Sequence, residues 1–288
     1  MTARIRPARE GELELIAEFV AHLQARPESR IPFFDESPEE IAAEIASWGS
    51  TWTAKCLVAE DRGQVVGFAG VEVDSELGRA WIYGPFAEDE AWEALSDPLL
   101  QEAVALAAVD DLELVGEAAH LRLGALAARH GFPRGRPSLG LEITRELVER
   151  LPAIGAPRLE PRHQEAFVAL HEALFPRTYY SGLQLADQHE RGEATVLTLL
   201  AGESVVGYAV GRGKGHEGYI DFLGVAEHAR GRGHGRALTT SMCHTLLEDP
   251  QRARVRLTVY EDNAPALALY HHLGFQRATT MVGYRRRP

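Results

Sequence analysis

The fold is decided by residues 219–238, which read Tyr219-Ile220-Asp221-Phe222-Leu223-Gly224-Val225-Ala226-Glu227-His228-Ala229-Arg230-Gly231-Arg232-Gly233-His234-Gly235-Arg236-Ala237-Leu238. An apolar strand leads into a glycine-rich loop, and the loop opens a helix. Glycines let the backbone turn tightly with its N–H groups facing outward, and a helix N-terminus is partially positive. Arginines 230, 232 and 236 add full charges. The stretch therefore predicts a phosphate or pyrophosphate site.

The loop matches neither of two familiar phosphate-binding motifs. A Walker P-loop ends in Gly-Lys followed by Ser or Thr, whereas this loop ends in Gly235-Arg236-Ala237. A Rossmann fingerprint lies early in a βαβ unit and has an acidic residue about 20 positions later. Three alternating glycines alone also suit a flexible turn, so other evidence must decide between the two interpretations.

That evidence is a second motif, Asn263-Ala264-Pro265-Ala266-Leu267-Ala268-Leu269-Tyr270-His271-His272-Leu273-Gly274-Phe275. Together with Arg230-x-x-Gly233-x-Gly235 it resembles the signature segments of the GNAT acetyltransferases, in the same order along the chain. With the strand meander before them, the resemblance covers essentially all of residues 155–288. It implies a mixed α/β fold and transfer of an acyl group from acyl-CoA to an amine.

The resemblance also implies roles for single residues. Loop amides would hold the CoA pyrophosphate, the strand edge before the loop would pair with the pantetheine arm, and Asn263 would bind near that arm. Tyr270 would be the general acid that protonates the departing CoA thiolate, the alternative being an aromatic packed on a helix face. The residues expected to bind the cofactor are Leu223, Gly224, Val225, Arg230, Gly231, Arg232, Gly233, His234, Gly235, Arg236 and Asn263.

A direct transfer also needs a group that removes a proton from the attacking amine, because amines are mostly protonated at neutral pH. Asp221 is the candidate base. Side chains alternate along a strand, so Asp221 is expected on the same face as Tyr219 and Leu223. Glu217, Glu261 or a chain of water molecules would serve as well, and a purely structural Asp221 is an equal alternative.

Acceptor binding is expected from the irregular segment Phe175-Pro176-Arg177-Thr178-Tyr179-Tyr180-Ser181-Gly182. In GNAT proteins the corresponding region faces the thioester. Tyr179 and Tyr180 would form a wall of the acceptor pocket, and Arg177 would pair with an acidic group of the acceptor. The alternative is that these aromatic rings pack on the domain core.

The chain contains an internal repeat. Val65-Val66-Gly67-Phe68-Ala69 recurs as Val205-Val206-Gly207-Tyr208-Ala209, and Arg129-His130-Gly131-Phe132 matches His272-Leu273-Gly274-Phe275. We therefore expect two tandem GNAT-like domains, each a mixed, mostly antiparallel sheet flanked by helices. The predicted boundaries are residues 1–150 for the first domain, 151–156 for a Pro- and Gly-containing linker and 157–288 for the second. In the second domain the elements are expected near residues 157–160, 163–174, 182–191, 194–201, 204–212, 217–225, 234–248, 253–260, 263–273 and 275–284.

The first copy lacks the residues that the family's chemistry needs. Where the second copy has its glycine loop, the first has Ala87-Glu88-Asp89-Glu90-Ala91-Trp92, whose carboxylates would repel a pyrophosphate. His120 falls where Asn263 does, and Ala127 where Tyr270 does. The first domain is therefore predicted to be degenerate and non-catalytic.

Composition narrows the class of protein. Residues 1–152 carry 14 basic against 28 acidic residues, and residues 153–288 carry 16 against 14, so an acidic half argues against nucleic-acid binding. No apolar run is long enough for a membrane span, and the N-terminus does not read as a signal peptide, so a cytoplasmic protein without membrane partners is expected. Only two cysteines occur, far apart, and neither a disulfide nor a bound metal is expected.

The sequence thus predicts an acetyltransferase that moves an acetyl group from acetyl-CoA to a primary amine of a small molecule or peptide, as a monomer or homodimer. The tandem arrangement is similar to that of the mycothiol synthases, so acetylation of a thiol-sugar conjugate is the enzymatic alternative. A CoA-binding sensor with little turnover is the alternative of a different class.

Overall fold

The computed structural model describes residues 3–34, 36–152, 154–176, 178–202 and 204–288, apart from the side chain of Lys214. The chain forms two compact units. Unit 1 consists of Met1–Pro137 together with Thr280–Pro288, and unit 2 of Ser138–Thr279. Each unit has its own hydrophobic core.

The two halves of the chain repeat one order of elements, as the internal repeat predicts. The first half contains β1 (Arg4–Pro7), α1 (Leu13–Gln24), α2 (Pro38–Ser47), β2 (Cys56–Asp61), β3 (Gln64–Asp74), β4 (Arg79–Ala87), α3 (Asp89–Ala107), β5 (Asp111–Glu117), α4 (Leu121–Arg129) and β6 (Arg134–Thr144). After α5 (Arg145–Val148), the second half contains α6 (Gln164–Leu174), α7 (Gly182–Glu190), β7 (Thr195–Ala201), β8 (Ser204–Lys214), β9 (Glu217–Val225), α8 (His234–Leu246), β10 (Arg254–Tyr260), α9 (Ala264–Leu273) and β11 (Gln276–Arg286). The elements predicted for the second half agree with these bounds to within a few residues. The one exception is 157–160, which contributes an isolated bridge, Arg158 to Leu197, rather than a strand.

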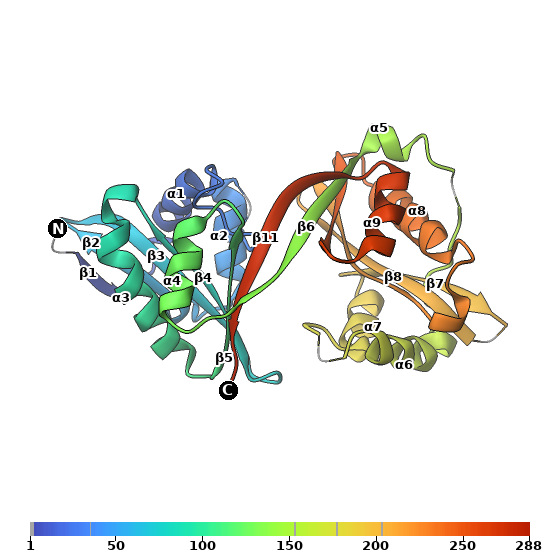
Figure 1. Ribbon diagram of the computed structural model, residues 1–288, viewed down its shortest axis with the longest axis horizontal. Helices are drawn as coiled ribbons and strands as arrows, with labels where there is room; N and C mark the ends of the chain where they lie inside the picture. The colour runs from blue at the N-terminus through green and yellow to red at the C-terminus, as the bar shows by residue number, and fades with distance from the viewer. Residues whose placement is uncertain (1–2, 35, 153, 177, 203) are drawn as a thin grey trace. The chain divides into compact units, whose positions relative to one another are not determined.

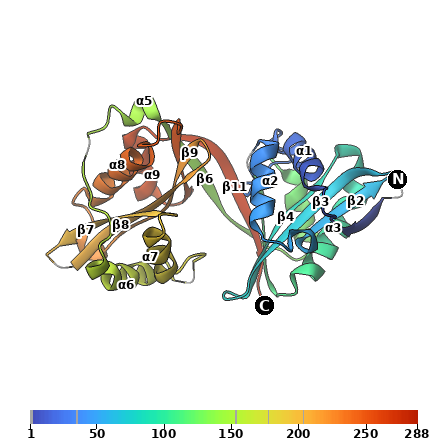
Figure 2. The same cartoon turned by 180° about the vertical axis from the view of Figure 1, so that it is seen from behind.

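Unit 1 is a mixed sheet with helices on both faces. Its strand order is β1-β2-β3-β4-β5-β11, in which β4 and β5 run parallel and the other neighbours antiparallel. Helices α1 and α2 cover one face (Figure 2) and α3 and α4 cover the other (Figure 1). The expected mixed, mostly antiparallel α/β architecture is confirmed.

Unit 2 repeats this architecture with the strand order β6-β10-β9-β8-β7, in which only β10 and β9 run parallel. Helices α8 and α9 pack on one face and α6 and α7 on the other (Figure 1). Helix α7 begins at a capping box, because Ser181 and Gln184 each bond the other's backbone N–H. Helix α9 begins at Asn263, whose side chain accepts from the Ala266 N–H, and ends at Gly274 with φ of 98°.

The halves exchange their last strands. Residues 138–144 of β6 pair with β10 of unit 2, whereas residues 281–286 of β11 pair with β5 of unit 1. The division of the chain therefore differs from a single cut at the predicted linker 151–156, because each final strand continues the sheet of the other copy. Linker composition marks a connection between elements but says nothing about strand partners.

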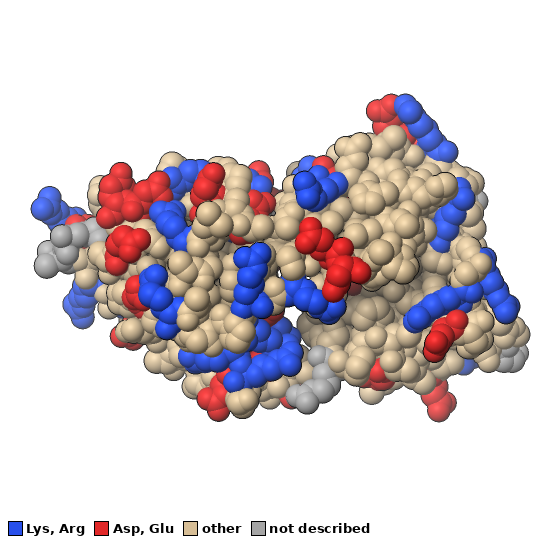
Figure 3. Space-filling view, viewed as in Figure 1, with Lys and Arg blue, Asp and Glu red and all other residues tan. Residues whose placement is uncertain are grey.

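The acidic excess of the first half does not collect in one patch on the face seen in Figure 3. Acidic and basic side chains alternate over the part of that face formed by the first half. Many acidic and basic side chains of the first half are paired, for example Arg122 with Asp89 at 2.7 Å and Arg129 with Asp97 at 2.8 Å. Within the described residues, no helix combines the length and the apolar composition that a bilayer crossing requires.

Candidate active site

The centre of the candidate site is an opening between β9 and β10. The two strands are paired from Glu217 and Arg254 up to Ile220 and Leu257, and their described pairing stops there although both strands continue. On its other side β9 stays paired with β8 as far as Val225. The edge of Leu223, Gly224 and Val225 that faces β10 is thus left without a strand partner, which leaves room for an extended ligand beside it. The Val225 carbonyl already accepts a hydrogen bond from Arg230 Nε at 3.1 Å.

A β-bulge lies at the start of this opening. Val210 of β8 pairs with Phe222 and Gly211 pairs with Ile220, so Asp221 is an extra residue on β9. The bulge reverses the alternation: Ile220 and Leu223 both pack on the α8–α9 side, whereas Phe222 packs on the α6–α7 side. The expectation that Asp221 shares a face with both Tyr219 and Leu223 is wrong for Leu223, because simple alternation assumes an unbroken strand.

Asp221 is held by an arginine of the neighbouring strand. Its Oδ2 accepts a hydrogen bond from Arg212 Nε at 2.7 Å, and only 8% of its side chain is exposed. Burial raises the pKa of Asp221, and the Arg212 charge opposes that rise. Arg212 also donates to Gln188 of α7 at 3.1 Å. Sequence reasoning missed Arg212; a cation just after the apolar residues 205–210 of β8 was the available signal.

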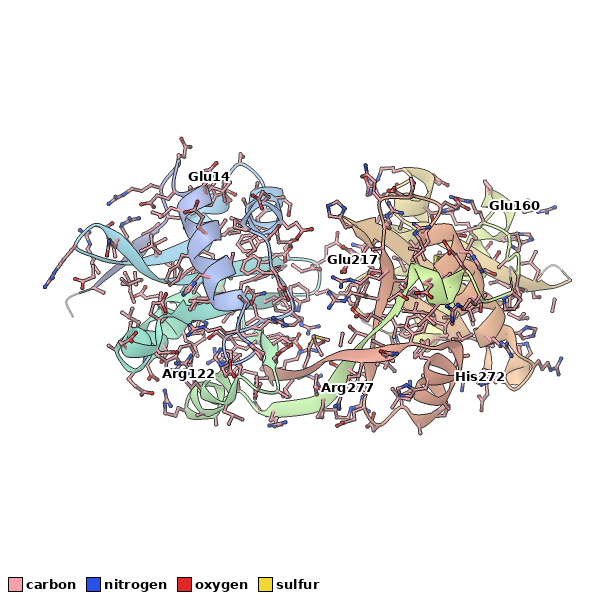
Figure 4. All side chains as sticks on the ribbon, turned by 90° about the horizontal axis from the view of Figure 1, so that it is seen from above. Glu14, Arg122, Glu160, Glu217, His272 and Arg277 are labelled. Carbon is pink, nitrogen blue, oxygen red and sulfur yellow. The ribbon has the colours of Figure 1, made fainter. Side chains whose placement is uncertain are left out.

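The opening is bridged at its base by two hydroxyls that the sequence did not single out. Tyr219 Oη and Thr258 Oγ1 lie 2.6 Å apart and join β9 to β10 at the end of their pairing, since Tyr219 pairs with Arg256 and Thr258 is the first residue of β10 beyond the ladder. Glu217, labelled in Figure 4, pairs with Arg254 at 2.9 Å and with Arg256 at 3.3 Å. It is therefore engaged in ion pairs, as Asp221 is. The described ion pairs do not include Glu261, which is exposed.

The glycine loop lies at the N-terminus of α8, where the sequence places it. Gly231 and Gly233 have φ of 74° and 81°, and a Cβ at either would have no atom within 4 Å, so open space remains above the loop. Gly235 packs close to α9, since a Cβ there would lie 3.2 Å from Leu269 Cδ2. His234 is half-buried, and the three arginines, Arg230, Arg232 and Arg236, are exposed and form no ion pair with a described residue. Positive charge at this helix end is therefore uncompensated.

Tyr270 lies on α9 with 7% of its surface exposed, in the core between α8, α9 and the sheet. Its ring centroid is 5.6 Å from that of Phe275. Burial raises the pKa of Tyr270 to about 12, so the phenol stays protonated at neutral pH. Among the described residues its hydroxyl has no hydrogen-bond partner. Asn263 is exposed and its carbonyl oxygen caps α9, leaving its amide N–H groups for a ligand.

The segment before α7 presents aromatic side chains over the α6–α7 face. The Tyr179 ring stacks on Phe222 at 4.9 Å, with 40% of its surface exposed, and meets the Tyr180 ring edge-on at 5.1 Å. The Arg212 guanidinium lies 5.0 Å from the centroid of Tyr180, and His171 contacts the Tyr180 carbonyl oxygen at 3.0 Å. Arg177 lies outside the described residues. Tyr179, Tyr180, Asp221 and Arg212 are thus brought together beside the opening.

Unit 1 has the same opening, but its own chain occupies it. Described pairing of β4 with β5 stops at Ile82 and Leu114, and beyond it the Glu117 N–H donates to the Arg30 carbonyl at 3.0 Å. At the start of α3, Asp89 is paired with Arg122 at 2.7 Å and with Arg26 at 3.0 Å. His120 caps α4 as Asn263 caps α9, and Ala127 is fully buried.

Within the described residues no group of three His, Cys, Asp or Glu is placed to hold a metal ion.

Comparisons with known proteins identify relatives of this arrangement. Residues 158–275 match the model of the acetyltransferase (GNAT) family. A mycothiol acetyltransferase of a Nocardioides species is 31% identical over 222 residues, which are 65% of this chain and 74% of that protein. A solved structure that shares the fold is a GCN5-related N-acetyltransferase from Sphaerobacter thermophilus, with a TM-score of 0.76 and 19% identity; the match covers 99% of this chain and 96% of that one. Another is a tandem GNAT protein from the clavulanic acid biosynthesis pathway, with a TM-score of 0.66 and 16% identity; the match covers 98% of both chains.

Proposed function

We propose a function from the premise that this chain belongs to the GNAT acetyltransferase family and has a tandem architecture similar to mycothiol synthase. In this proposal it transfers an acetyl group from acetyl-CoA to a primary amine of a small molecule or peptide. The observation that carries the proposal is the β9–β10 opening, with an unpaired strand edge on one side and an uncompensated cationic helix end next to it. A thioester in that opening would be reachable from the α6–α7 face.

Three groups of residues bind different parts of acetyl-CoA in this proposal. The pantetheine arm pairs with the free edge of Leu223, Gly224 and Val225, as an added strand would. The pyrophosphate binds the backbone amides at the start of α8, with Arg230, Arg232 and Arg236 neutralising its charge. Asn263 donates from its free amide to the pantetheine arm.

The reaction is a direct transfer in which the amine nitrogen attacks the thioester carbonyl carbon. Asp221 accepts the proton that the amine loses, directly or through water, and burial moves its pKa in the direction that a base working near neutral pH needs. The tetrahedral intermediate collapses, the C–S bond breaks, and Tyr270 donates its phenolic proton to the CoA sulfur. Tyr179 and Tyr180 form the acceptor wall, and Arg177 contacts an acidic group of the acceptor.

Unit 1 is non-catalytic in this proposal. Its opening holds the Arg30 segment, its helix start carries Asp89, and Ala127 offers no proton. The cytoplasmic location and a monomeric or homodimeric state stay predictions.

Acetylation of the amine of a thiol-sugar conjugate is a second candidate, favoured by the mycothiol acetyltransferase relative. A CoA-binding sensor is disfavoured because Tyr270 is present and held protonated.

The proposal is tested by calorimetry of the whole chain with acetyl-CoA and by CoA release with a panel of primary amines that includes amino sugars and short peptides. We expect one equivalent of acetyl-CoA to bind and at least one amine to be acetylated. An Asp221→Asn variant should bind acetyl-CoA as the wild type does but lose the acidic limb of its pH profile. A chain that binds no acetyl-CoA contradicts the proposal, and binding without turnover favours the sensor.

A further inference from the structure

One strand of unit 2 comes from the half of the chain that lacks catalytic residues. Residues 138–144 of β6 pair one for one with all seven residues of β10, from Ser138 opposite Tyr260 to Thr144 opposite Arg254. This ladder covers the edge of β10 that faces away from β9. Without β6, that edge would expose unpaired backbone groups together with the apolar side chains of β10.

The inward side chains of β6 belong to the same core as the proposed acid. Leu139, Leu141 and Ile143 are at most 6% exposed and share one hydrophobic cluster with Tyr270 and Phe275. Each is a side chain whose burial stabilises the unit. The surroundings of Tyr270 are therefore built partly from residues of the first half.

Helix α5, which follows β6 directly, secures the same region from its end. Its first residue, Arg145, donates to the Arg252 carbonyl at 2.6 Å and to the Asp249 carbonyl at 2.8 Å, in the connection between α8 and β10. A Cβ placed on Gly274, the residue that ends α9, would lie 3.8 Å from Leu147 Cδ1 and 3.9 Å from Ile143 Cδ1. The C-terminal end of the helix that carries Tyr270 thus lies near side chains of β6 and α5, and Leu147 packs against the core cluster that contains Tyr270 and Leu273.

The outward face of β6 takes part in the ion pairs beside the opening. Glu142 lies 3.5 Å from Arg256 and 3.8 Å from Arg254, and both arginines also contact Glu217 of β9. Of these four residues, Glu142 comes from the first half. The group links β6 to β9 across β10, two residues before the Tyr219–Thr258 contact.

We propose that the first half serves the second as the donor of β6 and α5, and that these two elements position Tyr270. A copy without a cofactor site of its own is then indispensable for the activity of the other copy. The donor-strand role rests on the strand pairing alone, whereas the positioning of Tyr270 rests on the proposed function.

The first experiment cuts the chain on either side of the donated elements. A protease recognition sequence is inserted after Gly155, which is exposed, or, as a matched control, after Gly63 in the exposed β2–β3 turn. After cleavage, unfolding and separation, the two C-terminal fragments are refolded alone. The fragment that starts at residue 64 keeps β6 and α5, whereas the fragment that starts at residue 156 lacks both.

We expect the fragment from residue 64 to bind acetyl-CoA and the fragment from residue 156 to fail until the fragment 1–155 is added back. Binding by the fragment from residue 156 alone, within threefold of the uncleaved chain, would overturn the proposal. So would failure of both fragments, because more than β6 and α5 would then be required. If the uncleaved chain itself binds no acetyl-CoA, the proposed function fails, and hydrogen exchange of β10 in the two fragments still decides the donor-strand role.

The second experiment tests positioning in the full chain. Leu147→Ala truncates a side chain that packs against the core cluster of Tyr270 and Leu273, and Glu146→Ala, on the exposed side of α5, is its control. With the fastest amine of the panel as probe, we expect Leu147→Ala to lower kcat at least fivefold, to speed hydrogen exchange in α9 and to leave acetyl-CoA affinity within twofold. Wild-type kcat and exchange in Leu147→Ala would refute the positioning role.

Discussion

At the scale of single residues, Tyr270 carries the sharpest expectation. Tyr270→Phe should lower kcat by about 10²- to 10⁴-fold, the usual worth of a general acid, with acetyl-CoA affinity nearly unchanged. Because burial raises the pKa of Tyr270 to about 12, wild-type kcat should show no loss from its ionisation below about pH 11. Tyr284→Phe, at a buried tyrosine of unit 1, is the control and should leave kcat unaltered. A Tyr270→Phe enzyme with wild-type kcat would assign Tyr270 to the core alone.

His120 makes the stability of unit 1 depend on pH. It is 2% exposed, and burial lowers its pKa from 6.5 to about 3. Between these values the unfolded imidazole binds a proton and the folded one does not, so stability present above pH 6.5 is lost as the pH falls. Between pH 6.5 and pH 5 the free energy of unfolding of unit 1 should fall by about 2 kcal/mol because of His120. The His120→Asn variant should not show this fall. Urea titrations followed by tryptophan fluorescence measure it in unit 1, which holds Trp48, Trp52, Trp81 and Trp92. Equal pH dependence in wild type and variant would contradict the assignment.

Residue types at the candidate site could be predicted from the sequence, but their partners could not. The motifs locate Tyr270, Asn263 and the loop glycines because their spacing follows from local geometry. Arg212 and Thr258 contact Asp221 and Tyr219 only through strand register, which one sequence does not reveal. The bulge at Asp221 escaped prediction for the same reason, since neither Asp221 nor its neighbours Ile220 and Phe222 is a glycine or a proline, and Gly211 lies opposite it on β8 only through strand register.

At the scale of elements, the start of α8 should determine cofactor affinity. Gly233 has φ of 81°, a conformation that costs other residues about 1–2 kcal/mol, and its open surroundings leave room for a ligand. Gly233→Glu should weaken acetyl-CoA binding at least a hundredfold in calorimetry, because it adds a carboxylate where the pyrophosphate binds.

Gly131→Glu is the matched control for Gly233→Glu. Gly131 has φ of 72°, is equally open, and lies in a turn of unit 1. The Gly131→Glu variant should show a fall in Tm similar to that of Gly233→Glu but bind acetyl-CoA with unchanged affinity. Equal losses of affinity in the two variants would mean that backbone strain, rather than charge at the loop, explains the effect.

At the scale of the whole molecule, the duplication could be predicted from the sequence and the strand exchange could not. Repeated hairpin and Gly-Phe segments reveal two copies, because each copy needs the same turns and core positions. Strand β6 follows α4 directly and reads as the natural end of the first copy. Its pairing with β10 depends on contacts between residues more than a hundred positions apart, which local patterns do not encode.

Removal of residues 280–288 should therefore damage the half of the chain that is remote in sequence. The deletion takes away Val282 and Tyr284 from the core of unit 1 and the bidentate contact of Arg285 with Asp111 at 2.7 and 2.6 Å. We expect urea titrations followed by tryptophan fluorescence to show that the free energy of unfolding of unit 1 falls by several kcal/mol, at about 1.5–3 kcal/mol for each buried side chain that is removed. Acetyl-CoA binding by unit 2 should persist. Loss of acetyl-CoA binding, with a wild-type unfolding transition of unit 1 in tryptophan fluorescence, would contradict this prediction.

The crossed strands also impose an order on synthesis. When β6 leaves the ribosome its partner β10 does not yet exist, and unit 1 waits for β11, which is translated after every other strand that the structure describes. The sheet of unit 2 is incomplete until β10 has been translated and that of unit 1 until β11 has been translated, so β6 and β5 carry open strand edges until then. Open strand edges of this kind are prone to aggregate until their partner strands arrive. Gene fission would leave two incomplete proteins and loss of either copy would leave one, because each copy supplies a strand to the sheet of the other.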